Sequence, residues 1–378
     1  MQLGLRFAGV ALWLAFLLGA SHASAWHTLP PGTEGWRASG RSGIRGITVG
    51  PIESSQWPGR GYGSASSEAL LDELQRMGST WVSVTPFGRV WSLTSTDILM
   101  DFEAPYLENR AAVARMIRQA KARGMGVLLI PHLWVETGGW RGEMDPGSEE
   151  GWRAYQASYR AFVLSWAELA AEAGADGFSI GVECKSWSGR FAEYWSRLIR
   201  DVRQRFPGFL TYSANWDEVD NVVFWDQLDL IGVNAFYPLA YHDNATYTDY
   251  LAGAARAREE IHGFAERLQM PVLFVEIGYT TRQNAAVQPW IWPDVMTNVV
   301  IDEHEQARAL SALFETFLPE PWFAGFFLWR YYADLDDVSQ EDIWGFSPHG
   351  KLAEPMLSQV FRWSWAADST PHLGLSRP

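Results

Sequence analysis

The chain has 378 residues, of which 47% are hydrophobic, and a formal net charge of −14. This length suits one large domain or two ordinary ones, with enough apolar residues for a sizeable core. The negative charge excludes nucleic acid as an expected partner, because phosphates would be repelled and no basic cluster offsets the repulsion. The single cysteine excludes an internal disulfide. The sequence contains no CxxC or HExxH motif, so we expect no metal, and we also expect no organic cofactor.

The N-terminus is typical of a secretory signal peptide. Arg6 supplies a positive charge, residues 7–20 are mostly apolar, and Ala23-Ser24-Ala25 matches the small-residue cleavage pattern. The apolar stretch is short for a membrane span. We therefore predict a secreted or periplasmic protein with no membrane contact in its mature form. The alternative is an N-terminal anchor that is not cleaved.

Strand-like and helix-like segments alternate through the rest of the chain. The expected strands span residues 46–49, 81–87, 127–133, 178–183, 209–215, 228–236, 272–276 and 323–329. The expected helices span residues 66–77, 109–123, 149–172, 191–205, 247–268, 301–317 and 351–363. The strands are apolar on both faces, which is typical of parallel strands buried between helices.

Eight strands that alternate with helices predict an α/β fold, a (β/α)₈ TIM barrel, in a single domain over residues 46–365. A doubly wound open sheet is the alternative, but the Gly50-Pro51 turn lacks the glycine-rich phosphate loop usual after its first strand. The remaining divisions are a signal peptide over 1–25, an N-terminal extension over 26–45 and a polar C-terminal tail over 366–378.

Two of the expected strands end in a glutamate. They are Gly177-Phe-Ser-Ile-Gly-Val-Glu183 and Pro271-Val-Leu-Phe-Val-Glu276. A carboxylate is costly inside a strand without a partner but can lie in a cleft at the strand's end, and the carboxyl ends of barrel strands share one face. Retaining glycosidases need such a pair. We assign Glu183 as the general acid/base and Glu276 as the nucleophile; for each, the alternative is a structural ion pair.

Other polar and aromatic residues follow the expected strands, and their types suit a sugar site. Amides and a histidine can bind hydroxyl groups, while indole and phenol rings can stack on the C–H faces of sugars. The substrate-binding candidates are His132, Trp134, Asn215, Trp216, Asn234, Tyr237, Tyr279 and Trp329. We expect Tyr237 to hydrogen-bond Glu276. The alternatives are a structural histidine, turn-capping asparagines and tryptophans that fill the core.

The sequence resembles glycoside hydrolase family 113, which includes β-1,4-mannanases. Four stretches carry the resemblance: Trp81-Val-Ser-Val-Thr-Pro-Phe87, Leu210-Thr-Tyr-Ser-Ala-Asn-Trp-Asp-Glu218, Phe224-Trp-Asp-Gln-Leu-Asp-Leu-Ile-Gly-Val-Asn-Ala-Phe-Tyr-Pro238 and Pro271-Val-Leu-Phe-Val-Glu-Ile-Gly-Tyr279. The resemblance implies a (β/α)₈ barrel of the retaining clan A, with Glu183 as acid/base and Glu276 as nucleophile. One departure is the Cys-Lys-Ser-Trp sequence after Glu183, which is less similar to the family.

These observations predict a secreted retaining β-glycoside hydrolase that acts on an oligo- or polysaccharide, most similar to a β-1,4-mannanase. Two alternatives keep the same residues. One is a carbohydrate-binding barrel without catalysis, and the other is a transglycosylase that acts on a β-linked polysaccharide. The sequence leaves the sugar, the linkage and the choice between endo and exo action open.

Overall fold

The computed structural model describes residues 43–53, 56–292, 297–336, 341 and 343–362. The expected signal peptide, most of the N-terminal extension and the C-terminal tail lie outside the described residues. Within the described part of the chain, no helix is both long enough and apolar enough to cross a membrane.

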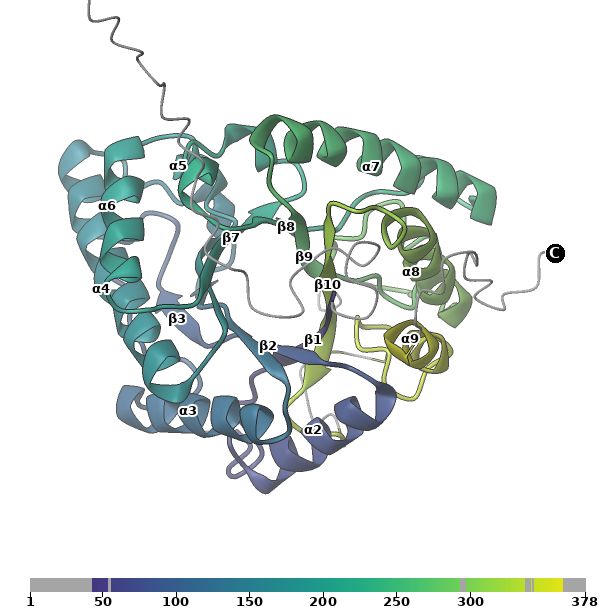
Figure 1. Cartoon of the computed structure of the whole chain (residues 1–378), viewed down its shortest axis with the longest axis horizontal. Coiled ribbons are helices and arrows are strands. Elements are labelled where there is room, and N and C mark those ends of the chain that lie inside the picture. The colour runs from purple at the N-terminus through teal and green to yellow at the C-terminus, as the bar shows by residue number, and fades with distance from the viewer. Residues whose placement is uncertain (1–42, 54–55, 293–296, 337–340, 342, 363–378) are drawn as a thin grey trace, which may run out of the picture.

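Eight parallel strands form a closed barrel, in the order β1, β10, β9, β8, β7, β6, β4, β2 (Figure 1). Every neighbouring pair is parallel, and β1 pairs with both β10 and β2, which closes the ring. The (β/α)₈ barrel predicted from the sequence is therefore confirmed. The barrel strands are β1 (Ile44–Gly50), β2 (Trp81–Val84), β4 (Gly126–Leu129), β6 (Gly177–Val182), β7 (Phe209–Asn215), β8 (Ile231–Asn234), β9 (Val272–Ile277) and β10 (Phe323–Tyr332).

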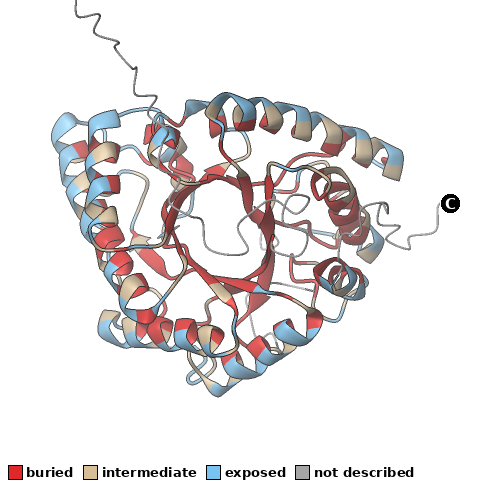
Figure 2. Cartoon of the chain, in the orientation of Figure 1, coloured by how far each residue is buried: buried red, intermediate tan, exposed pale blue. Residues whose placement is uncertain are grey.

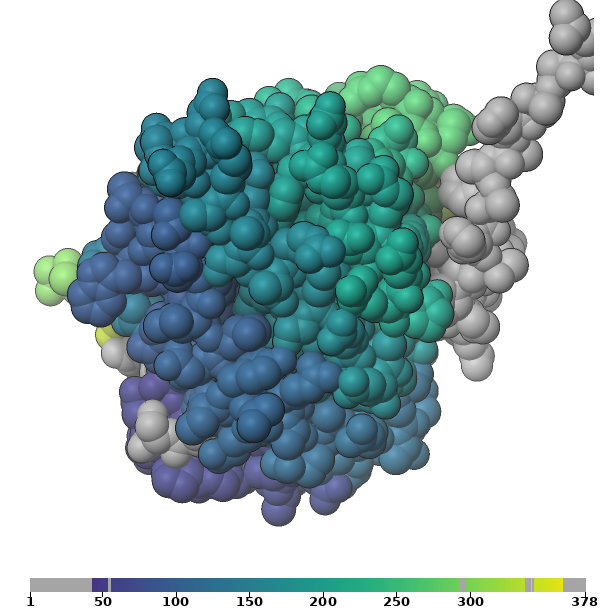
Figure 3. Space-filling model, turned by 90° about the vertical axis from the view of Figure 1, so that its left-hand side faces the viewer, coloured from purple at the N-terminus to yellow at the C-terminus, as the bar shows by residue number. Residues whose placement is uncertain are grey.

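Helices surround the barrel and bury one side each against the strands, so their outer sides are exposed (Figure 2). Their ends follow local signals: Ser148 caps the start of the longest helix, which ends at Gly174 in the left-handed conformation. Figure 3 shows the outer surface over α3, α4 and α6. The helices are α2 (Ala65–Met77), α3 (Tyr106–Ala122), α4 (Glu149–Ala173), α5 (Lys185–Ser188), α6 (Ala192–Arg203), α7 (Tyr247–Leu268), α8 (Glu303–Phe317) and α9 (Ala353–Arg362).

Two expected strands, 81–87 and 127–133, are each divided in the structure. Their first parts, β2 and β4, belong to the barrel, whereas β3 (Phe87–Val90) and β5 (His132–Val135) pair with each other in a separate parallel sheet. Pro86 and Pro131 stand at the two breaks, where the missing N–H of proline interrupts the hydrogen-bond ladder. The small sheet therefore lies beyond the carboxyl ends of β2 and β4.

The inside of the barrel is filled by large apolar side chains, including Trp81, Phe209 and Phe327. Glycines on neighbouring strands make room for these rings. A Cβ at Gly46 would lie 2.2 Å from the Phe327 ring, and one at Gly177 would lie 2.2 Å from the Phe209 ring. Because the interior is packed, polar groups at the carboxyl ends of the strands can gather only at the barrel's mouth.

Candidate active site

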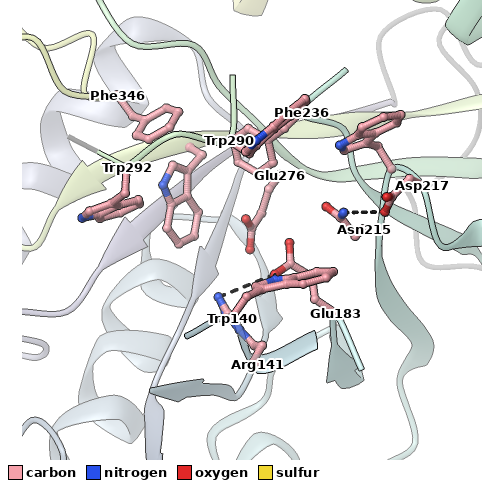
Figure 4. A pocket seen from close by; sticks show the side chains of 12 residues that line it. Trp140, Arg141, Glu183, Asn215, Asp217, Phe236, Glu276, Trp290, Trp292 and Phe346 are labelled. Atoms are coloured by element: carbon pink, nitrogen blue, oxygen red, sulfur yellow. Dashed lines mark hydrogen bonds and ion pairs between the residues drawn. The ribbon is translucent and has the colours of Figure 1, made fainter. Parts of the chain in front are cut away.

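A cleft of about 470 Å³ opens at the carboxyl ends of the barrel strands (Figure 4). Its wall combines two glutamates with many aromatic rings. The residues that line it are Trp140, Arg141, Glu183, Asn215, Trp216, Asp217, Phe236, Glu276, Trp290, Trp292, Trp329 and Phe346. Both glutamates predicted from the sequence therefore lie in one cleft, and their carboxylates point toward one another (Figure 4).

Glu183 lies at the end of β6 and is held by donors from two other segments. The indole N–H of Trp140 donates to Oε2 at 2.8 Å, and Nδ2 of Asn234 on β8 donates to Oε1 at 3.0 Å. Nη2 of Arg141 is 3.8 Å from Oε2. These contacts fix the orientation of the carboxylate. Glu183 as a whole residue is 7% exposed.

Glu276 lies on β9, opposite Asn234 in the register of β8 and β9. It is 4% exposed, and its Oε1 is 3.3 Å from Nε2 of His132 without hydrogen-bond geometry. Burial raises the pKa of Glu276 to about 7, while the charges of Arg141 and Arg330 act in the opposite direction. The site therefore contains a carboxyl group that titrates near neutral pH.

His132 lies beneath the cleft against Trp329. Their rings stack with centroids 5.8 Å apart, and the histidine is fully buried. Burial and the charge of Arg141 hold the pKa of His132 well below its usual range, so the ring is neutral at physiological pH. Neither ring nitrogen has a hydrogen-bond partner within the described structure, which leaves one donor and one acceptor beside Glu276.

Aromatic rings form the walls of the cleft. Trp216, which follows β7, stacks on Trp290 from the segment between β9 and α8, with ring centroids 5.7 Å apart. Trp292 packs against Phe346, with centroids 5.6 Å apart. Flat apolar walls of this kind suit the C–H faces of a sugar ring. The polar atoms between them can bind hydroxyl groups.

The rim of the cleft carries a chain of polar contacts beside Glu183. Nδ2 of Asn215 donates to Oδ1 of Asp217 at 2.7 Å, and Nζ of Lys185 donates to Oδ2 of Asp217 at 2.6 Å. Lys185, from the Cys-Lys-Ser-Trp sequence, is therefore neutralised by Asp217. Within the described residues, no group of three or more His, Cys, Asp or Glu side chains could hold a metal ion.

Five predicted binding residues are not part of the cleft lining. Two of them, His132 and Asn234, lie against the carboxylates of Glu276 and Glu183; the other three are Trp134, Tyr237 and Tyr279. Trp134, on the small sheet, is 42% exposed and packs against the Phe102 ring. The Tyr237 ring packs against Trp216 and Phe274. Its hydroxyl has no hydrogen-bond partner in the described structure, so the expected bond to Glu276 is not present. The Tyr279 hydroxyl donates to the carbonyl oxygen of Tyr237 at 2.9 Å, which is a structural contact.

Sequence reasoning missed several residues that line the cleft, above all Arg141, Phe236 and Phe346. Arg141 and Phe346 come from connecting segments, where no periodicity indicates a direction. A signal did exist for Phe236: it is two residues after Asn234, and alternate residues of an extended chain face the same side. Trp140, Trp290 and Trp292 also line the cleft and were not among the predicted binding residues.

The model of Glycoside Hydrolase Family 113 matches residues 57–351, more than half of the chain. The chain belongs to Glycoside Hydrolase Family 113. This confirms the resemblance and shows that the protein is a glycoside hydrolase. A comparison with curated protein sequences gives no significant match.

Solved structures of family 113 are similar over nearly their whole length. The β-mannanase AaManA from Alicyclobacillus acidocaldarius, in complex with ManMIm, has 25% identity and a TM-score of 0.72, covering 84% of this chain and 97% of that one. A second family 113 structure, a β-1,4-mannanase complex, has 24% identity and a TM-score of 0.71, covering 84% and 98%. A family 5 mannosidase from Rhizomucor miehei, at 11% identity and a TM-score of 0.57, shares the fold and covers 84% and 92%.

Proposed function

We propose that this glycoside hydrolase is a retaining enzyme similar to the β-1,4-mannanases, with Glu276 as nucleophile and Glu183 as acid/base. The observation that carries the proposal is the meeting of these two carboxylates, from β9 and β6, in one aromatic cleft (Figure 4). A retaining glycosidase uses one carboxylate to attack and a second to transfer protons.

In the first step, the Glu276 carboxylate attacks the anomeric carbon, and the bond from that carbon to the leaving oxygen breaks. Glu183 donates its proton to the leaving oxygen. In the second step, Glu183 takes a proton from water, whose oxygen attacks the same carbon and releases Glu276. Asn234 donates a hydrogen bond to Glu183 and is also the register partner of Glu276 on the neighbouring strand. This supports the proposal that both glutamates act on the same bond of the substrate.

The substrate is an oligo- or polysaccharide with β-linked mannose. The similarity to the two family 113 β-mannanases supports this choice, as do the paired rings along the cleft. The sequence pattern at residues 1–25 supports secretion. The acidic net charge also suits an uncharged partner rather than nucleic acid.

The first test is reducing-sugar release by the mature protein from β-mannan, glucomannan, β-glucan and xylan. We expect release from mannan by the wild type and none by Glu276→Ala at unchanged thermal stability. Binding of glycan without release by the wild type would indicate a carbohydrate-binding barrel instead. Accumulation of longer oligosaccharides would indicate a transglycosylase.

The two carboxylates can be told apart by rescue with azide. In Glu276→Ala, azide would attack from the side of the missing nucleophile and give an α-mannosyl azide. In Glu183→Ala, a 2,4-dinitrophenyl β-mannoside, whose leaving group departs without a proton, would still form the glycosyl-enzyme intermediate, and azide would attack this intermediate and give a β-mannosyl azide. Identification of the product by NMR checks both roles, and the opposite pair of products would reverse the assignment.

A further inference from the structure

A tyrosine and a glutamate are buried together behind the cleft wall. Tyr212 on β7 and Glu218, just after that strand, are both 0% exposed, and neither lines the cleft. Burial raises the pKa of Glu218 to about 7, and the charge of Glu183 acts in the same direction. A buried carboxyl group reduces stability unless its hydrogen bonds compensate for the lost water, so its contacts indicate its role.

These contacts lead to the backbone of the proposed acid/base. The backbone N–H of Cys184 donates to Oη of Tyr212 at 2.6 Å. The Tyr212 hydroxyl in turn donates to Oε1 of Glu218 at 2.5 Å. The direction follows from chemistry: the amide can only donate, so the hydroxyl accepts from it and gives its single proton to Glu218.

The other oxygen of Glu218 fixes a second part of the cleft. Oε2 accepts the backbone N–H of Asn215 at 3.1 Å, and Asn215 lines the cleft. One buried carboxyl group therefore holds the end of β7 directly and the residue after Glu183 through a hydroxyl group. The carboxyl ends of β6 and β7 are joined at this point.

Glu183 needs such support because its backbone is strained. Its φ angle is 50°, in the left-handed region that costs a residue other than glycine about 1–3 kcal/mol. Its own N–H donates to the carbonyl oxygen of Ser213 at 2.8 Å. Two consecutive N–H groups, those of Glu183 and Cys184, are thus held by β7, one by the strand's backbone and one by Tyr212.

We infer that Tyr212 and Glu218 are positioning residues for Glu183: they hold its backbone in the left-handed conformation that directs the carboxylate into the cleft. The inference rests on the proposed function, in which Glu183 is the acid/base. Without the Tyr212 hydroxyl, the Cys184 N–H is buried without an acceptor, and the turn can relax toward an unstrained φ. Proton transfer by Glu183 then becomes less efficient, while Glu276 on β9 is unaffected.

The test compares two substrates that differ in their need for an acid. Cleavage of β-mannan requires protonation of the leaving oxygen, whereas a 2,4-dinitrophenyl β-mannoside has a leaving group that departs without a proton. We expect Tyr212→Phe to lower kcat/KM on mannan about 10-fold to 100-fold. On the dinitrophenyl substrate, whose kcat/KM reports the first step, we expect a change of less than about threefold. Glu218→Gln, which offers one acceptor oxygen to two donors, should show the same selectivity with a smaller loss.

Tyr159→Phe is the matched control. The Tyr159 hydroxyl is buried beside the same segment and donates to the carbonyl oxygen of Ile180 at 3.2 Å. It approaches Cys184 only at Sγ, 3.7 Å away, and not at the backbone N–H that Tyr212 holds. We expect this variant to retain wild-type kcat/KM on both substrates. Equal losses on the two substrates in Tyr212→Phe, or the same selective loss in Tyr159→Phe, would overturn the inference. If Tyr212→Phe does not fold, Glu218→Gln decides by the same criterion. A wild type that is inactive on both substrates would instead overturn the proposed function.

Discussion

The indole N–H of Trp140 donates a 2.8 Å hydrogen bond to Oε2 of Glu183. Trp140 belongs to the segment between β5 and α4, so a residue outside the barrel orients a carboxylate at the end of a barrel strand. Its ring also lines the cleft. The segment after β5 therefore both lines the cleft and orients the carboxylate of the proposed acid/base.

Replacement of Trp140 by phenylalanine should separate these two contributions. Trp140→Phe keeps an aromatic wall but removes the donor, so we expect kcat on β-mannan to fall about tenfold, for the loss of a charge-assisted hydrogen bond. KM should change much less. The control is Trp322→Phe, because Trp322 precedes β10 at the other end of the barrel and its indole N–H has no partner in the described structure. A pure KM effect in Trp140→Phe would contradict the orienting role.

The pKa of Glu276 predicts how activity depends on pH. A nucleophile must be ionised, and burial raises the pKa of Glu276 to about 7, so kcat/KM should fall as the pH decreases below about 7. The charge of Arg141 lowers this pKa. Arg141→Met should therefore move the acid limb of the profile to higher pH. Lys185→Met is the control, since Lys185 pairs with Asp217, and the limb should stay in place. An unchanged limb in Arg141→Met would exclude Glu276 as the titrating group.

We expect Trp134 to extend the substrate-binding surface beyond the cleft. It lies two residues after His132 on β5, so both side chains face the same side of the strand, and it is 42% exposed. We expect Trp134→Ala to raise KM for long β-mannan about threefold to tenfold, for the loss of one stacking contact. Trp134→Phe should have a smaller effect. KM for a short aryl β-mannoside should not change, and an equal rise there would place Trp134 at the reaction centre.

The barrel could be predicted because its strands differ clearly from its helices in sequence. Strands apolar on both faces alternate with helices, three of which stop close to Gly78, Gly124 and Gly174, and Glu183 and Glu276 stand where an apolar run stops. A buried strand rarely tolerates an unpaired carboxylate, so each glutamate was expected to lie in a cleft at the end of its strand. The split at Pro86 and Pro131 was not predicted, although the sequence carried its signal, since proline disfavours a continuous ladder.

The rest of the site depends on packing that sequence periodicity does not encode. Arg141 and Phe346 reach the cleft from connecting segments, whose paths follow from contacts distant in the sequence. Tyr237 illustrates this limit just after a strand. It follows the end of β8 by three residues, its ring packs against Trp216 and Phe274, and the bond expected to Glu276 does not form. The role inferred for Glu218 depends on Tyr212 and Cys184, which only the fold brings together.

The close packing inside the barrel gives a prediction on stability that is independent of catalysis. A Cβ at Gly46 would lie 2.2 Å from the Phe327 ring, whereas a Cβ at Gly263 on α7 would have no neighbour within 4 Å. Gly46→Ala must displace a buried ring and should lower the free energy of unfolding by about 1–3 kcal/mol. Gly263→Ala should raise it by about 0.5–1 kcal/mol, because alanine loses less backbone entropy in a helix. Urea unfolding of both variants measures the two changes. Equal stability of the two variants would show that the barrel interior has room for another methyl group.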